Sequence, residues 1–194
     1  MALRVVTPPV GTWLDLAQIK AHLRVDYDDD DDLIMGYLKA AQRLIEGETQ
    51  RRYLAQNLEW VLDNWHDPMP LPIAGPVGFD DISVPQISYT ALDGSTQVLD
   101  PSIYWVRPAG QTVKIVKRWF VIWPWLGDGA ERVTIEIAIA GDGTNIPDAA
   151  LHAARLLVSH WYQNRDAVVG VDNRDSSTEL PLGVEALLTS ERWD

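Results

Sequence analysis

The sequence predicts an α+β protein: a small bundle of helices from the N- and C-terminal parts of the chain, with a β-rich insertion between them. Apolar residues recur at helical spacing near both ends, whereas the middle alternates and is rich in Pro, Gly, Val, Ile and Trp. The 194 residues, 46% of them hydrophobic, suit one domain with a large insertion. We expect residues 1–55 and 144–194 to form the helical body and residues 56–143 the inserted subdomain.

The N-terminal segment predicts an extended stretch followed by a short helix. Pro8 and Pro9 disfavour a helix over residues 1–14. The phrase DLAQIKAHLRV then places Asp15 as an N-cap and Gln18 three residues later, which is the spacing of a capping box. Apolar residues follow at helical intervals, so a short helix begins here.

A run of five aspartates stands before the longest helical pattern. The broad apolar stripe that follows predicts a helix from about residue 31 to about residue 51, weakened at Gly36 and Gly47. Carboxylates at a helix N-terminus interact favourably with the helix dipole, so we interpret the run as a helix start with a solvated acidic face. Cation binding is the less favoured alternative, because no register of the run fits an EF-hand loop. The five aspartates are Asp28, Asp29, Asp30, Asp31 and Asp32.

The middle of the chain predicts several short strands. NLEWVLDNW alternates like a strand, and Asp93-Gly94 between two strand-like runs is a strong hairpin signal. SIYWVRP, TVKIVK and RVTIEIAIAG add further strands, the last with its isoleucines on one face. MPLPIAGPV reads as a proline-broken edge or loop.

The C-terminal part returns to helix. Residues 147–165 carry Pro147 and Asp148 at the start of an apolar helical pattern, both of which suit a first turn. Residues 166–179 are polar and turn-rich, which is typical of a mobile loop. A short helix from about 184 to 189 and a tail close the chain.

Charge and composition exclude several classes of function. The formal net charge of -12 argues against a protein that grips DNA phosphates, although it suits one past which DNA slides. The absence of cysteine excludes disulfides, thiolate metal sites and a cysteine nucleophile. We see no signal peptide and no apolar run of about 20 residues, so we expect no membrane partner and synthesis in a cytoplasm.

No catalytic, cofactor or metal signature is present in the sequence. The helix with His152 and His160 spaces them eight residues apart, not the four of a zinc-binding helix. GDGAER and GDGTN are turns without a phosphate-binding pattern, and no nucleophile elbow occurs. We therefore expect no enzyme activity and no cofactor.

Nine tryptophans are many for this length, and three lie in RWFVIWPWLGDG: Trp119, Trp123 and Trp125. Large rigid indoles suit a β core, a subunit interface or a carbohydrate platform, and all three readings stay open. We name these three residues as a candidate subunit interface.

Stretches at both ends carry a family resemblance. Residues 16–51, with the phrase AHLRVDYDDDDD and then a helix ending in EGETQR, resemble the opening of tailed-phage head–tail connector (adaptor) proteins. Residues 146–168, with HWYQNR, look like that family's later helix, and residues 180–193 are similar to its closing segment. Residues 56–143 resemble larger members of that family only in their general pattern of strands and turns. Related adaptors also occur in prophages and gene transfer agents.

The resemblance implies a structural part of a virion or phage-like particle neck. Family members form a ring, dodecameric on the portal, that joins the portal protein to a tail-side neck or stopper protein and lines the DNA ejection channel. By this resemblance the aspartate run is a candidate channel-facing segment. A C-terminal segment commonly reaches the portal; here Leu187, Leu188 and Trp193 are the candidate contacts.

Two other classes of function compete with this reading. The β-rich part could be a ligand-binding module that presents tryptophan to a glycan or a protein. A metal-dependent hydrolase built around the aspartates is the less favoured alternative.

Overall fold

The computed structural model describes residues 1–74, 80–110, 112–165 and 182–189, and these form two compact units. The β unit consists of Met1–Val10 and Arg51–Asn145, and the helical unit of Gly11–Gln50 and Ile146–Asp194. The predicted α+β class, with helices from both ends and a β-rich part between them, is confirmed. The predicted boundaries, 1–55 with 144–194 and 56–143, remain a proposal for how the chain divides into folding domains.

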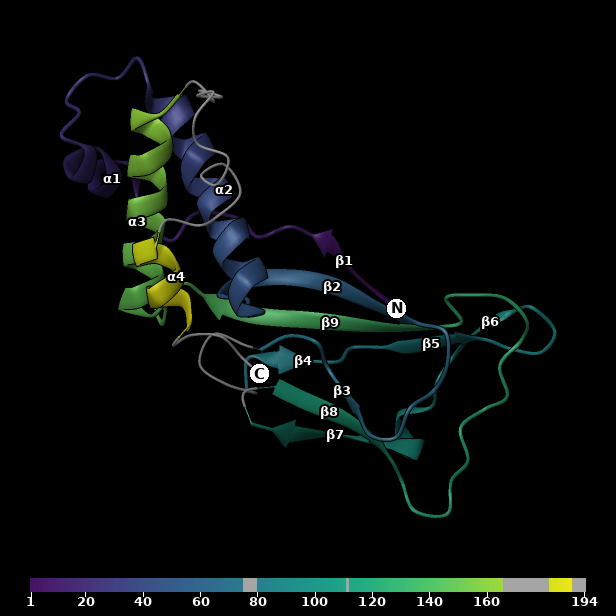
Figure 1. Cartoon of the computed structure of the whole chain (residues 1–194). Coiled ribbons are helices and arrows are strands. Elements are labelled where there is room, and N and C mark those ends of the chain that lie inside the picture. The colour runs from purple at the N-terminus through teal and green to yellow at the C-terminus, as the bar shows by residue number, and fades with distance from the viewer. Residues whose placement is uncertain (75–79, 111, 166–181, 190–194) are drawn as a thin grey trace. The chain divides into compact units, whose positions relative to one another are not determined.

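The described residues of the helical unit form four helices (Figure 1): α1 Leu16–Leu23, α2 Asp31–Thr49, α3 Asp148–Gln163 and α4 Leu182–Thr189. The capping box predicted for α1 is present: the Gln18 backbone N–H donates to Asp15 Oδ1 over 2.7 Å, and the Asp15 N–H donates to Gln18 Oε1 over 3.0 Å. Arg24 ends α1 and Gln50 ends α2, each in the left-handed conformation.

The core of the helical unit comes from the apolar stripes seen in the sequence. The long helix α2 packs against α3, and α3 packs against α4. Small residues of α3 let the helices approach closely, since Ala150, Ala153 and Ala154 are fully buried. Buried larger side chains fill the remaining space: Ile34, Leu38, Ile45, Leu157, Val158, Val184 and Leu188.

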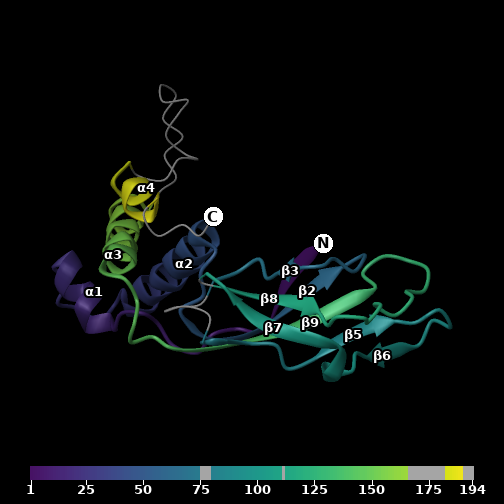
Figure 2. The same ribbon diagram turned by 90° about the horizontal axis from the view of Figure 1, so that it is seen from below.

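The β unit is built from two antiparallel sheets (Figure 2). The larger sheet has the order β1-β2-β9-β5-β6, with β4 also paired to β9, and the smaller has the order β3-β8-β7. Its strands are β1 Ala2–Thr7, β2 Leu54–Leu62, β3 Met69–Pro70, β4 Ile82–Ser83, β5 Ile87–Thr90, β6 Thr96–Val98, β7 Tyr104–Ala109, β8 Thr112–Lys117 and β9 Val133–Asp142. A 3-10 turn, Pro101–Ile103, precedes β7.

The two sheets share one apolar core. The alternation predicted for the last strand is present, because Val133, Ile135, Ile137 and Ile139 are all buried. They belong to one cluster with residues of the smaller sheet, such as Met69, Val113 and Ile115. The residues between them on each strand therefore point away from the core, so each sheet has an outer face.

The N-terminal segment, predicted only as extended, is the edge strand of the larger sheet. β1 pairs with β2 from Ala2↔Val61 to Thr7↔Asn57. The predicted hairpin at Asp93-Gly94 joins β5 to β6, and Gly94 has the positive φ that its turn requires. The Asp93 carboxylate caps this turn by accepting from the Ser95 N–H and hydroxyl.

Two glycines provide a matched test of this packing. A Cβ at Gly141 would lie 2.1 Å from the Tyr53 carbonyl oxygen, whereas one at the exposed helical Gly36 would meet nothing within 4 Å. We expect Gly141→Ala to lower the free energy of unfolding by about 1–3 kcal/mol, because the backbone must move. Gly36→Ala should raise it by about 0.5–1 kcal/mol. Denaturant unfolding of both variants checks this, and equal effects at the two positions would contradict it.

Candidate functional site

The most exposed apolar surface of the β unit lies on the tryptophan loop, residues 118–126 between β8 and β9. Trp119, Ile122 and Trp125 are 82%, 81% and 79% exposed, and Phe120 is fully exposed. Large side chains this exposed and this close together mark an interaction site more often than a free surface. Of the three readings left open by the sequence, a β core is excluded for Trp119 and Trp125.

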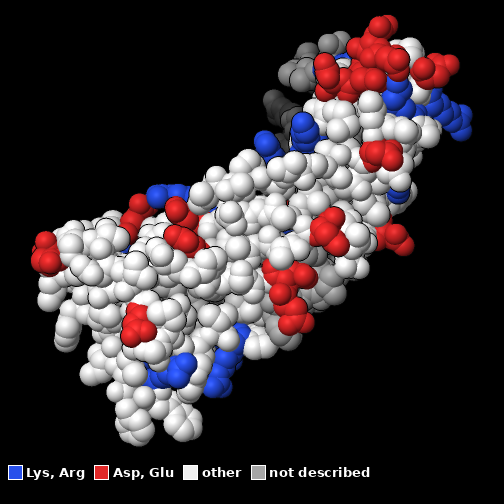
Figure 3. Space-filling model, turned by 180° about the vertical axis from the view of Figure 1, so that it is seen from behind, with Lys and Arg blue, Asp and Glu red and all other residues white. Residues whose placement is uncertain are grey.

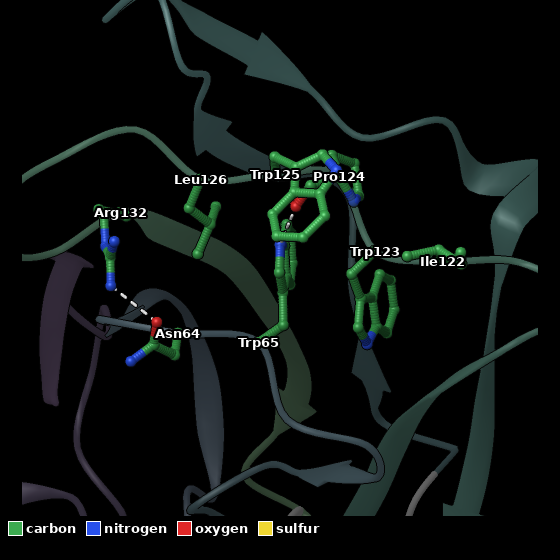
Figure 4. A pocket seen from close by; sticks show the side chains of 8 residues that line it. All are labelled: Asn64, Trp65, Ile122, Trp123, Pro124, Trp125, Leu126 and Arg132. Atoms are coloured by element: carbon green, nitrogen blue, oxygen red, sulfur yellow. Dashed lines mark hydrogen bonds between the residues drawn. The ribbon is translucent and has the colours of Figure 1, made fainter.

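The tryptophan loop is anchored at several points, although its apolar side chains project outward. Trp123 stacks on Trp65 with ring centroids 4.9 Å apart and planes 13° apart. Trp65 Nε1 donates to the Pro124 carbonyl oxygen over 2.9 Å (Figure 4). At its start, the Arg118 N–H donates to the Ile103 carbonyl oxygen over 2.9 Å. The exposed side chains are thus presented on a held backbone, which lowers the entropy lost on binding.

A pocket of about 440 Å³ opens beside this loop. Figure 4 shows its lining: Asn64, Trp65, Ile122, Trp123, Pro124, Trp125, Leu126 and Arg132. Arg132 is fixed at one end, where it donates to Asn64 Oδ1 over 2.7 Å. Trp123 Nε1 is buried and has no hydrogen-bond partner within the described chain. The apolar walls of the pocket suit an apolar side chain from a neighbour.

The aspartate run ties the helices of the helical unit together. Asp30 holds the N-cap position of α2, but its side chain does not cap the helix. Its carboxylate instead accepts from the Tyr162 hydroxyl over 2.6 Å and from the Arg165 guanidinium over 2.5 Å. We call Asp30, Tyr162 and Arg165 the aspartate clamp. It joins the start of α2 to the end of α3.

Two further aspartates of the run bind one lysine of α1. Lys20 Nζ lies 2.6 Å from Asp28 Oδ1 and 2.8 Å from Asp31 Oδ1. Asp31 and Asp32 lie in the first turn of α2, where the helix dipole favours a negative charge. Figure 3 shows acidic side chains gathered at this end of the helical unit, with basic ones beside them. Whether any of them faces a channel stays a prediction.

These contacts shift the protonation of the groups involved. The Tyr162 hydroxyl and then the Arg165 guanidinium hold the pKa of the Asp30 carboxyl below its ordinary value. The same hydrogen bond to Asp30 raises the pKa of the Tyr162 hydroxyl. Lys20 lowers the pKa of the Asp28 carboxyl through its hydrogen bond. The carboxylates of Asp28 and Asp30 are therefore held in their charged form.

The candidate portal contacts lie in different environments. Leu188 is 1% exposed and packs within the helical unit, whereas Leu187 is half-buried. Trp193 lies outside the described residues. Leu188 thus contributes to holding α4 in place, and a portal contact by Leu187 or Trp193 stays a prediction.

No group of three or more His, Asp or Glu side chains in the part of the chain that the structure describes is placed to hold a metal ion. No described helix has the length and apolarity that crossing a bilayer requires.

Comparison with known proteins bears on the function. Residues 14–77 match the family model described as phage gp6-like head-tail connector protein. No curated protein matches.

Solved structures match over the whole chain. A chain of "Virion of native gene transfer agent (GTA) particle" is similar at TM-score 0.74 and 25% identity, and one of "Neck of native GTA particle computed with C12 symmetry" at 0.70 and 25%. A chain of "Neck of empty GTA particle computed with C6 symmetry" shares the fold at TM-score 0.72 and 24% identity. Each match covers 99% of this chain and 95% of the other.

These matches confirm the resemblance inferred from the sequence. They support a structural head–tail connector (adaptor) protein, and neither the ligand-binding module nor the hydrolase is supported.

The aspartate clamp predicts a specific loss of acid stability. Asp30→Asn removes the charge that pairs with Arg165, so the variant should unfold at lower denaturant concentration than the parent at pH 7. Because the pKa of Asp30 is lowered from 3.8, its contribution is complete above that value and is lost as pH falls through the folded pKa. The difference measured at pH 7 should therefore shrink at a pH well below 3.8, as Asp30 becomes protonated in the folded state.

Asp29→Asn is the matched control, since this exposed neighbour in the same run has no hydrogen bond or ion pair in the described structure. It should leave the unfolding midpoint unchanged at both pH values. An equal fall of the unfolding midpoint in the two variants would contradict the clamp, because it would mean that the aspartate run acts only through its total charge.

Proposed function

We propose that this chain is a head–tail connector (adaptor) subunit in the neck of a tailed phage or gene transfer agent particle. Copies form a ring, twelve on the portal, that joins the portal to a tail-side protein and surrounds the passing DNA. The proposal rests most on one observation: the structural match to a chain of a gene transfer agent virion covers 99% of this chain and 95% of the other, at 25% identity. Ring formation is supported by neck proteins of this fold in particles with C6 and C12 symmetry.

The charge of the chain agrees with a structural role that depends on its shape and on its contacts with other proteins. The net charge of -12 keeps a channel wall from holding DNA phosphates, since tight DNA binding needs Lys and Arg contacts. The resemblance supports a part without catalysis. We propose synthesis in the bacterial cytoplasm followed by incorporation into the particle neck.

Two surfaces divide the contacts in this proposal. The tryptophan loop of the β unit serves contacts between subunits, because Trp119 and Trp125 project outward from an anchored loop and Trp123 holds it in place. The C-terminal segment from Gly183 onward reaches the portal, with Leu187 and Trp193 as contacts and Leu188 as the internal anchor of α4.

Electron microscopy of the purified chain with the portal ring of its own particle tests the role. We expect a collar of this chain on one end of the portal, with density for the β unit and the helical unit in every copy. A portal ring that stays bare at high concentration of the chain, together with particles whose necks lack it, would overturn the proposal.

Two tryptophan variants test the division of contacts. Trp193→Ala should lower portal binding, measured by co-sedimentation, by about tenfold or more, because buried interface tryptophans often contribute 2 kcal/mol or more. Trp119→Ala is the matched control: it removes an exposed indole that the proposal assigns to contacts between subunits, so it should leave portal binding by a single subunit unchanged. Both variants should unfold like the parent. Reversed effects would contradict the assignment.

A further inference from the structure

The two outer faces of the β unit carry opposite charge in matching arrangements. On the larger sheet, Glu59 of β2 is the direct cross-strand partner of Glu136 of β9. On the smaller sheet, Arg107 of β7 is the direct cross-strand partner of Lys114 of β8. Glu59, Glu136 and Lys114 each lie between two core residues on their strands, so they point away from the shared core. Arg107 lies on the same face as Lys114, its direct cross-strand partner. One sandwich therefore has an acidic outer face and a basic outer face.

Each pair is unfavourable within a single chain. Like charges directly opposite on a sheet destabilise it. None of the four side chains forms an ion pair with a described residue. Arg4 is the cross-strand neighbour of Glu59, but its guanidinium pairs with Glu131. Within the described residues, Glu59, Glu136, Arg107 and Lys114 therefore have no direct ion-pair partner, and each face carries the charge that would pair with the other.

The acidic face is hollowed around its two glutamates. A groove of about 380 Å³ is lined by Val6, Asn57, Leu58, Glu59, Pro85, Glu136 and Ile137. Val6 is more than half exposed, and both glutamates are partly buried. Partial burial strengthens the attraction of these carboxylates for a cation that enters the groove. The groove has room for the long side chains of Arg and Lys.

The basic face is stiffened by an aromatic ring. The Arg107 guanidinium lies 4.2 Å from the centroid of the Trp105 ring, and that of Arg118 lies 5.1 Å from it. Stacking on Trp105 limits the rotamers of Arg107, so less entropy is lost when it meets a carboxylate. The basic face thus presents Arg107, held by Trp105, beside Lys114.

We propose that neighbouring copies of this chain pack head to tail, the basic outer face of one β unit (Arg107, Lys114) on the acidic groove (Glu59, Glu136) of the next. This inference rests on the proposed ring. A cyclic ring with more than two subunits needs heterologous contacts, in which two different patches of each subunit meet. Patches on opposite outer faces of one sandwich meet that requirement, since each copy offers one patch to each neighbour.

A second copy explains the basic face better than DNA does. The two basic side chains, Arg107 and Lys114, are matched in number by the two acidic side chains Glu59 and Glu136 of the same chain. The chain as a whole carries a net charge of -12, which disfavours DNA as a partner. DNA binding would also leave the like-charge pair of Glu59 and Glu136 without a partner.

Cysteine cross-linking tests the geometry directly, because the natural chain has no cysteine. Ala109 lies on the basic face beside Arg107, and Ala138 lies on the acidic face beside Glu136. We expect the A109C/A138C double variant, treated with a short bismaleimide, to give a ladder of multimers from the purified chain or from particles. The control A138C/L92C moves one thiol to an exposed hairpin residue and should give no ladder. Equal ladders from the two double variants would overturn the inference, and so would the absence of a ladder from A109C/A138C in both the purified chain and particles.

Charge reversal in the A109C/A138C background tests the electrostatics. R107E/K114E and E59K/E136K should each reduce the ladder on the order of 30-fold, because both reversals place like charges across the contact. An equimolar mixture of the two should restore it, since each reversed face then meets a reversed partner. A ladder unaffected by either reversal, or loss of duplex DNA binding by R107E/K114E without loss of the ladder, would overturn the proposal.

The outcome separates this inference from the proposed function. Particles whose neck contains a ring of this chain but whose A109C/A138C variant gives no ladder would overturn the head-to-tail contact alone. Particles whose neck lacks the chain would overturn the proposed function, whatever the purified chain does.

Discussion

The antiparallel pairing of β2 with β9 is the constraint on which the rest of the structure depends. β2 follows the first helical segment along the chain and β9 precedes the second, and Leu54 is paired with Asp142 where the ladder begins. The chain therefore leaves the helical segments and returns to them at neighbouring points. Since the entropy of closing a loop grows only with the logarithm of its length, a long insertion closed in this way costs little more than a short one. Two segments far apart in the sequence thereby form one helical unit.

Local signals were sufficient to predict most of the elements. The capping box at Asp15 and Gln18 and the hairpin at Asp93-Gly94 each depend on side chains within three residues of one another, so the sequence contains the whole interaction. The long helix, predicted from about residue 31 to 51, ends at Thr49. The period-2 pattern of β9 correctly separated its buried from its outer side chains, because one face of that strand meets the core along its whole length.

Contacts between distant residues could not be predicted in the same way. The acidic run was predicted as a helix start, but the clamp joins Asp30 to Tyr162 and Arg165, more than 130 residues away. The partner of the extended N-terminal segment was likewise invisible, since β1 lies on the edge of a sheet assembled from the middle of the chain. The tryptophans of RWFVIWPWLGDG follow no period, so the sequence did not distinguish Trp123, stacked on Trp65, from the exposed Trp119 and Trp125.

In the proposed head-to-tail contact, the charge pattern of the β unit lets one chain be both a stable subunit and part of a larger assembly. Cross-strand pairs contribute roughly 0.2–1 kcal/mol each when their charges are opposite, and a chain selected only for its own stability would place Glu opposite Lys or Arg on each sheet. This chain places Glu59 opposite Glu136 and Arg107 opposite Lys114 instead. The repulsion between like charges acts only on the outer faces and leaves the apolar core between the sheets intact, so the sandwich keeps its fold. A partner of opposite charge would relieve this repulsion on either face. A surface of this kind favours assembly over the free subunit without any change of conformation, because the unfavourable repulsion is already present in the monomer.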